Sequence, residues 1–289
     1  MMPESKFVQA NGIKQHYLDW GGDKAPLVTT HGTSLLGAAW IPVAQHLANH
    51  YRVIALDLRG HGDSEKASRG YTWDTLGKDF AAFLDALDLK QVFAVGHSRG
   101  GGVMIMAAPH CANRLKGLML IEPSLLMRNP QEVGAVTPTP RNLEAAERAR
   151  RRRAVFASRE EAFDSYHDRG MFRAWRDENL RLFLEHATFD RADGQVELKC
   201  PPELEAKFYL APIETDPIEA ASHFTCPILL SWGLSSEHFR PDLPLVAAFI
   251  HKTGCRTAQV RGSHFMTMQY PAEVARMIRD FGNSLAPVP

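Results

Sequence analysis

A serine flanked by two glycines is the pattern in this sequence that points most directly to chemistry. Ser98 lies at the centre of Gly96-His97-Ser98-Arg99-Gly100, which fits G-x-S-x-G. An apolar run precedes the pattern and small residues follow it, so it predicts a tight turn from a buried strand into a helix. Such a turn exposes the serine hydroxyl at the edge of a sheet, and the helix N-terminus favours developing negative charge. We therefore expect Ser98 to be a nucleophile.

A histidine near the end of the chain is the expected base. A serine hydroxyl is a weak nucleophile until a base removes its proton. His264 follows residues 261–263 directly after the last expected strand, where a loop can carry it over the carboxyl ends of the strands. We therefore expect His264 to be the general base. Three further histidines are expected in loops at the same edge, in structural or pocket-lining roles: His31, His61 and His97.

Two backbone N–H groups are expected to bind the oxyanion that forms when a serine attacks a carbonyl. The first is the N–H of Arg99, the residue after the nucleophile. The second should come from the loop His31-Gly32-Thr33-Ser34, and Thr33 is the expected donor. Only the N–H of Arg99 is required for this role, and its side chain is compatible with a place on the surface.

The elements that must position these residues follow from the apolar pattern. The dipeptide Asn11-Gly12 predicts a hairpin turn between two opening strands. Further strands are expected at 27–30, 51–56, 92–95, 115–121, 227–232 and 255–260. Helices are expected between them at 40–48, 72–89, 101–108, 243–252 and 271–285. This alternation predicts an α/β fold with a mostly parallel sheet and helices on both faces.

The alternation stops between residues 127 and 223. Helices are expected there at 141–153, 159–168, 172–186 and 201–208. We therefore expect a helical insertion after the sixth strand, lying over the ends of the strands. The chain then divides into a core of residues 1–126 and 224–289 and a cap of residues 127–223.

The expected substrate pocket draws on both parts of the chain. The arginine run 150–153 is expected to be a solvated helix face, with a site for an anionic substrate as the alternative. The residues expected to contact substrate are His31, Ser34, His97, Trp175 and Met266.

These residues together resemble the α/β-hydrolase superfamily. The matching motifs occur in family order: His31-Gly32, residues 57–64, residues 96–101 and Gly262-Ser263-His264. The resemblance implies the α/β-hydrolase fold, with the insertion as its cap domain. It also implies a triad of serine, histidine and an acid that needs neither a metal nor an organic cofactor.

The third triad member is where the sequence departs from the family. Many members carry Asp where this chain has Ser236, and a serine cannot stabilise an imidazolium as a carboxylate can. Glu122, at the end of the preceding strand, is the favoured acid. The local pattern Met119-Leu120-Ile121-Glu122 is similar to that of zearalenone-type lactonases and one haloalkane dehalogenase subgroup. Glu237 is the alternative acid.

The nucleophile narrows the expected reaction. The dehalogenase and epoxide-hydrolase branches of the family use Asp where this chain has Ser98, so the resemblance argues against both activities. We expect a carboxylic ester hydrolase that cleaves a small-molecule ester or lactone through an acyl-enzyme. Three alternatives remain: a carbon–carbon bond hydrolase of the meta-cleavage type, a cofactor-free perhydrolase, and a non-catalytic small-molecule receptor.

Composition limits the expected partners. Lysine plus arginine and aspartate plus glutamate both number 33, so no net field favours nucleic acid or an anionic membrane. The N-terminus lacks the pattern of a secretory signal, and no apolar run approaches the ~18 residues of a membrane span. The four cysteines are scattered without metal-ligand spacing. We therefore expect a cytoplasmic monomer or homodimer without a metal.

Overall fold

The computed structural model describes residues 2–135 and 137–285. Its main feature is an eight-stranded sheet in the order β1-β2-β4-β3-β5-β6-β10-β11. Its strands are β1 (Glu4–Ala10), β2 (Ile13–Asp19), β3 (Pro26–Thr30), β4 (Arg52–Leu56), β5 (Val92–His97), β6 (Leu115–Ile121), β10 (Ile228–Gly233) and β11 (Arg256–Val260). β1 and β2 form the expected antiparallel hairpin, and the strands from β4 to β11 pair in parallel. The predicted α/β fold with a mostly parallel sheet is confirmed.

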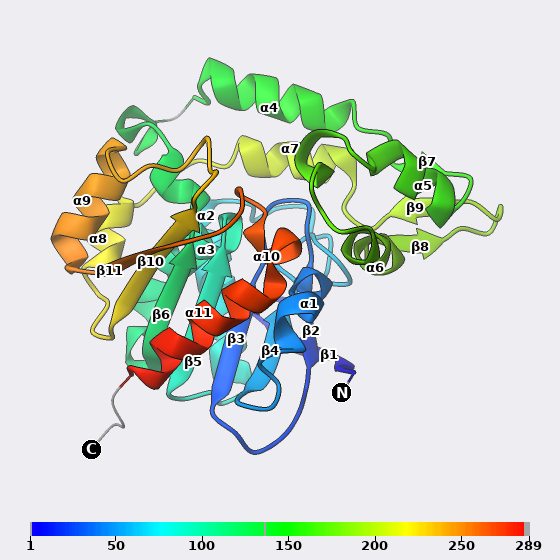
Figure 1. The fold of residues 1–289 in the computed structure, drawn as a ribbon. Coiled ribbons are helices and arrows are strands. Elements are labelled where there is room, and N and C mark those ends of the chain that lie inside the picture. The colour runs from blue at the N-terminus through cyan, green and yellow to red at the C-terminus, as the bar shows by residue number, and fades with distance from the viewer. Residues whose placement is uncertain (1, 136, 286–289) are drawn as a thin grey trace.

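Helices cover both faces of this sheet (Figure 1). One face carries α2 (Trp73–Ala86), α3 (Arg99–Cys111), α8 (Pro217–Ala221) and α9 (Pro244–Thr253). The other face carries α1 (Ile41–Ala44), α10 (Met266–Gln269) and α11 (Pro271–Asn283). The two faces are held by separate apolar clusters, which meet the sheet through alternate side chains of its strands.

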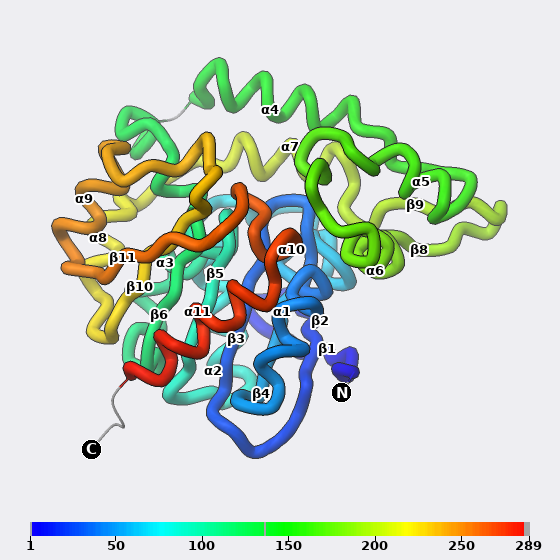
Figure 2. The backbone as a smooth tube through the Cα atoms, viewed as in Figure 1, coloured from blue at the N-terminus to red at the C-terminus, as the bar shows by residue number. Residues whose placement is uncertain are grey.

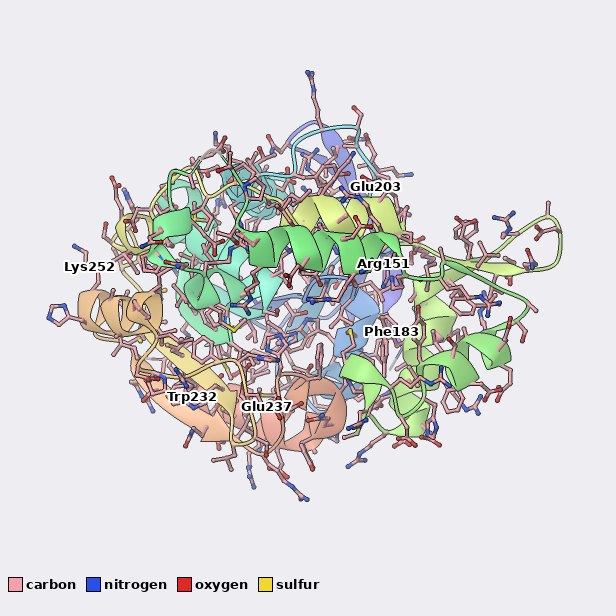
Figure 3. The ribbon with its side chains drawn as sticks, turned by 90° about the horizontal axis from the view of Figure 1, so that it is seen from above. Arg151, Phe183, Glu203, Trp232, Glu237 and Lys252 are labelled. Atoms are coloured by element: carbon pink, nitrogen blue, oxygen red, sulfur yellow. The ribbon has the colours of Figure 1, made fainter. Side chains whose placement is uncertain are left out.

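The insertion after β6 lies above the carboxyl ends of the strands (Figure 2). Its helices are α4 (Pro140–Arg150), α5 (Arg159–Tyr166), α6 (Asp177–Ala187) and α7 (Pro202–Tyr209). Figure 3 shows α4 alongside α7, with Arg151 and Glu203 labelled near this pair. All four helices were expected. The insertion is not entirely helical, however, because it also holds a small antiparallel sheet of β7 (Val155–Phe156), β9 (Val196–Leu198) and β8 (Thr188–Asp190).

These three strands escaped prediction because runs of two or three residues are too short to show an alternating pattern. Their pairing depends on packing against α5 and α6 rather than on local sequence. Within the described ranges, no helix combines the length and the apolar character that crossing a membrane requires.

Parallel pairing brings the loops after β5, β6, β10 and β11 to one edge of the sheet. In β5 and β6, His97 pairs with Ile121, so the residues that follow both strands are neighbours. In β10 and β11, Gly233 pairs with Val260, which places the loop of residues 261–265 beside the loop that leaves β10. The insertion covers this edge, so residues at four distant sequence positions converge under the cap.

The helix that follows Ser98 packs unusually closely on α2. A Cβ atom added to Gly77 of α2 would lie 2.6 Å from the backbone carbonyl carbon of Met106 in α3. Helix propensity alone favours alanine over glycine by about 1 kcal/mol. Overpacking against rigid backbone costs about 1–3 kcal/mol, so the steric cost of an alanine here should exceed its gain in helix propensity.

We therefore expect Gly77→Ala to lower the free energy of unfolding, measured by urea titration. The neighbouring exposed substitution Lys78→Ala is the control and should change it by less than about 0.5 kcal/mol. A Gly77→Ala protein that is more stable than the wild type would show that α2 and α3 are not packed this closely.

Candidate active site

Ser98 occupies the strained turn that the sequence predicts between β5 and α3. Its backbone has φ 52° and ψ −114°, a combination that side chains rarely adopt. Neighbouring backbone fixes the turn, because Ser98 N–H donates to the Ile121 carbonyl at 2.9 Å and Ser124 N–H donates to the Ser98 carbonyl at 2.9 Å. The turn needs a glycine at position 100, where a Cβ atom would lie 2.6 Å from the carbonyl carbon of Thr30.

His264 lies within hydrogen-bond distance of the serine. Its Nε2 is 2.9 Å from Ser98 Oγ, and its Nδ1 is 2.6 Å from a carboxylate oxygen of Glu122. With Nδ1 donating to the carboxylate, Nε2 is free to accept the serine proton. A second histidine fixes the loop, since His97 Nε2 donates to the backbone carbonyl of His264 at 2.8 Å.

Glu122 is completely buried at the end of β6, with φ 43°. Three groups donate to its carboxylate: His264 Nδ1, the N–H of Gly233 at 2.9 Å and Ser236 Oγ at 2.9 Å. A buried carboxylate needs such donors, because burial without them is costly. The structure thus brings together the favoured acid with Ser98 and His264.

Glu237 lies apart from this chain of hydrogen bonds. It is exposed in the loop that leaves β10, and Figure 3 labels it near Trp232. Among the described residues it makes no hydrogen bond to His264. Ser236, at the position of the usual family acid, supports the Glu122 carboxylate instead. Sequence reasoning missed this supporting role, because it depends on a contact between two loops.

The two expected oxyanion donors flank the serine. The N–H groups of Thr33 and Arg99 have no protein acceptor in the part of the chain that the structure describes. A Cβ atom on Gly32 would lie 3.2 Å from Ser98 Cβ, so the Thr33 loop closely approaches the nucleophile. The Arg99 side chain is not at the surface, because it is buried against Trp73 and Phe208.

Two of the residues expected to contact substrate have structural partners instead. His31 Nδ1 donates to the Gly32 carbonyl at 2.8 Å and its Nε2 accepts from Leu58 N–H at 3.0 Å, so both ring nitrogens are occupied. Met266 is fully buried in the apolar cluster that includes α11. His97 holds the loop of His264, as described above.

Ser34 and Trp175 lie where the core meets the cap. Ser34 borders a narrow crevice whose free volume, about 10 Å³, is at the lower limit for one water molecule. Phe172 and Phe183 of the cap line its other side. Trp175 packs against both phenylalanines and lies 6.0 Å from the ring of Phe265, next to His264. The cap thus presents aromatic side chains to the catalytic edge.

A larger hollow of about 490 Å³ lies on the cap, but no triad residue lines it. One group of residues has the geometry to hold a metal among those described: His16, Asp57 and Asp63. Asp57 is already bound there, by His16 Nδ1 at 2.7 Å and by the N–H groups of Gly37 and Asp63. This group organises the loop after β4 and does not include a triad residue.

Comparison with known proteins identifies the family of the chain. A family profile described as the alpha/beta hydrolase fold matches residues 25–245. Non-heme chloroperoxidase from Streptomyces lividans is 43% identical over 95 residues, which cover 32% of this chain and 34% of that protein. N-formylmaleamate deformylase from Pseudomonas putida is 37% identical over 117 residues, which cover 40% and 44%. The matches thus span less than half the length of these relatives.

Solved structures show the same fold over nearly the whole chain. E-2-(acetamidomethylene)succinate hydrolase superposes with a TM-score of 0.81 at 20% identity, covering 97% of this chain and 99% of that one. The enol-lactonase from Burkholderia xenovorans superposes with a TM-score of 0.72 at 20% identity, covering 96% and 100%. At these identities, the likeness establishes the fold alone.

The hydrogen bond between Glu122 and His264 predicts that a substitution at Glu122 lowers the reactivity of Ser98. Glu122→Gln should slow covalent labelling of Ser98 by a fluorophosphonate about 10⁴-fold, since the amide cannot stabilise the imidazolium. Glu237→Gln is the matched control and should label at close to the wild-type rate. Intact-protein mass spectrometry over time measures the labelling rate. If Glu237→Gln were the slow variant, the assignment of Glu122 as the acid would be refuted.

His97 predicts a pH dependence of stability. Burial lowers the pKa of its imidazole to about 3, and the nearby His264 contributes in the same direction. Between about pH 6.5 and 3 the unfolded chain therefore binds a proton that folded His97 does not. The free energy of unfolding should fall as pH drops through this window, by up to about 1.4 kcal/mol per pH unit for this histidine.

We expect His97→Gln to flatten this slope, because glutamine does not titrate. Urea unfolding of both proteins at several pH values below 7 measures the difference. Equal slopes in the two proteins would show that His97 takes up its proton equally well when folded.

Proposed function

The chain belongs to the family of the alpha/beta hydrolase fold, and from this premise we propose that it is a serine hydrolase that cleaves a carboxylic ester or lactone. The observation that carries the proposal is the continuous chain of hydrogen bonds from Ser98 through His264 to Glu122. Each group has the chemistry that its place requires: a hydroxyl on a strained turn, an imidazole with one free nitrogen, and a buried carboxylate.

The first half of the proposed reaction forms an acyl-enzyme. Ser98 Oγ attacks the substrate carbonyl while His264 Nε2 takes its proton. The carbonyl oxygen becomes an oxyanion, which accepts hydrogen bonds from the N–H groups of Thr33 and Arg99. The tetrahedral intermediate then expels the alcohol, which leaves with the proton from His264. In a lactone the alcohol stays attached to the acyl group.

The second half of the reaction releases the acid. His264 removes a proton from water, the resulting hydroxide attacks the acyl carbon, and Ser98 Oγ leaves with the proton. The Glu122 carboxylate is held in place by hydrogen bonds from Gly233 N–H and Ser236 Oγ. Its role is to stabilise the imidazolium and to hold the ring in the productive tautomer.

A carbon–carbon bond hydrolase is the second candidate, because the same triad and oxyanion donors suit attack on a ketone carbonyl. Similarity to the deformylase and to the chloroperoxidase is also consistent with other acyl substrates and with a cofactor-free perhydrolase. A non-catalytic receptor is the weakest alternative, because it has no need for an intact Ser98–His264–Glu122 chain.

Hydrolysis of a panel of p-nitrophenyl acyl esters and simple lactones tests the proposal directly. Loss of the nucleophile in Ser98→Ala should lower kcat by about 10⁶-fold on any substrate that the wild type cleaves. The control for folding is the circular dichroism spectrum of the variant. A folded wild type without activity on the panel, but with activity on a dienoate ketone, would replace the ester proposal by carbon–carbon cleavage.

A further inference from the structure

Arg99 is a buried arginine without a carboxylate partner. The other buried or largely buried arginines of the fold each pair with an acid: Arg59 with Asp79 at 2.7 Å, Arg128 with Glu132 at 2.6 Å and Arg152 with Glu205 at 2.7 Å. Arg99 is 3% exposed, yet no carboxylate among the described residues lies within 4.0 Å of it. Buried charges are normally paired, so this position calls for an explanation.

Neutral contacts hold the guanidinium group in place. Its Nε donates to Thr33 Oγ1 at 2.8 Å and its Nη2 donates to the Phe208 carbonyl at 2.6 Å. The group also lies over the rings of Trp73 and Phe208, at 4.4 and 4.9 Å from their centroids. Nη1 is buried and has no hydrogen-bond partner in the described residues.

The group remains a cation at neutral pH. Burial lowers the pKa of Arg99 to about 9, and repulsion from Arg128 adds to the effect, so the charged form still predominates at pH 7. A buried cation with an unused N–H group is a site that an anion would complete.

The position of this cation relates it to the nucleophile. Arg99 follows Ser98 directly, and its Nε binds the side chain of Thr33, the other oxyanion donor. Phe208 belongs to α7 of the cap. The guanidinium therefore lies where the nucleophile turn, the oxyanion loop and the cap meet.

We infer that Arg99 is a substrate-binding residue whose Nη1 binds a carboxylate carried by the substrate. The inference rests on the proposed function and gives it a substrate class: a monoester of a dicarboxylic acid, or a lactone with a free carboxylate. The bonds to Thr33 and Phe208 use Nε and Nη2, which leaves Nη1 as the N–H group for this carboxylate.

The cap arginines are weaker candidates for this role. In the run 150–153, Arg150 pairs with Glu203, Arg152 with Glu205 and Arg153 with Glu161. Their charges are already compensated. The expected helix face is wrong for residues 151–153, because α4 ends at Arg150 and Arg152 turns back to the buried Glu205. Arg150 therefore provides a matched control in which an arginine is lost from the cap.

The test compares kcat/KM for mono-p-nitrophenyl succinate with that for p-nitrophenyl butyrate, a neutral ester of similar length. The ratio of the two should fall about 10- to 100-fold in Arg99→Met, as expected for loss of a charge-assisted hydrogen bond. Arg99→Lys should keep part of the preference, and Arg150→Met should leave the ratio as in the wild type. An unchanged ratio in Arg99→Met, even with both rates lowered, would assign Arg99 a purely structural role and overturn the inference.

Binding of succinate separates this inference from the proposed function. Calorimetry on Ser98→Ala should detect succinate, and adding Arg99→Met should weaken its affinity at least about tenfold. If the wild type cleaves no ester or lactone while succinate binding still depends on Arg99, the carboxylate site is supported and the ester hydrolase is refuted. Equal succinate affinity with and without Arg99→Met would refute the carboxylate site alone.

Discussion

The catalytic edge depends on one buried carboxylate. Glu122 has no exposed surface, and an ionised group there is tolerable only because three donors surround it. These donors belong to the segment that ends β10, the loop beyond it and the loop after β11. The carboxylate therefore fixes three chain segments at once, and the parallel order β5-β6-β10-β11 is what allows them to meet.

The same dependence explains why the acid lies at Glu122. The family position after β10 holds Ser236, whose hydroxyl donates to a carboxylate and cannot replace one. A carboxylate at the end of β6 lies beside the same histidine as one after β10 would, because β6 and β10 are adjacent strands. The positive φ of Glu122 turns the backbone at this point and is held by Glu122 N–H donating to the Ser231 carbonyl. Two neighbouring strand ends thus offer equivalent access to His264.

Local patterns in the sequence were sufficient for the sheet, for most helices and for Ser98 and His264, whereas Glu122 was favoured through the family resemblance. Apolar periodicity and the strand-to-helix motif determine these features over short stretches of chain. Contacts between distant segments were not predictable in this way. The burial of the Arg99 side chain and the pairing of β7 with β9 each depend on a partner more than 20 residues away.

Arg99 shows how such a contact changes the interpretation of the cap. Its backbone N–H and that of Thr33 are the two oxyanion donors of the proposed reaction, and its side chain links the Thr33 hydroxyl to the Phe208 carbonyl. A displacement of α7 would therefore disturb the side chain of Thr33, which is linked to Phe208 through Arg99. Because both bonds use neutral acceptors, they leave the positive charge uncompensated. Through this one side chain, α7 is linked to the loop of Thr33, and an uncompensated cation is kept at the residue after Ser98.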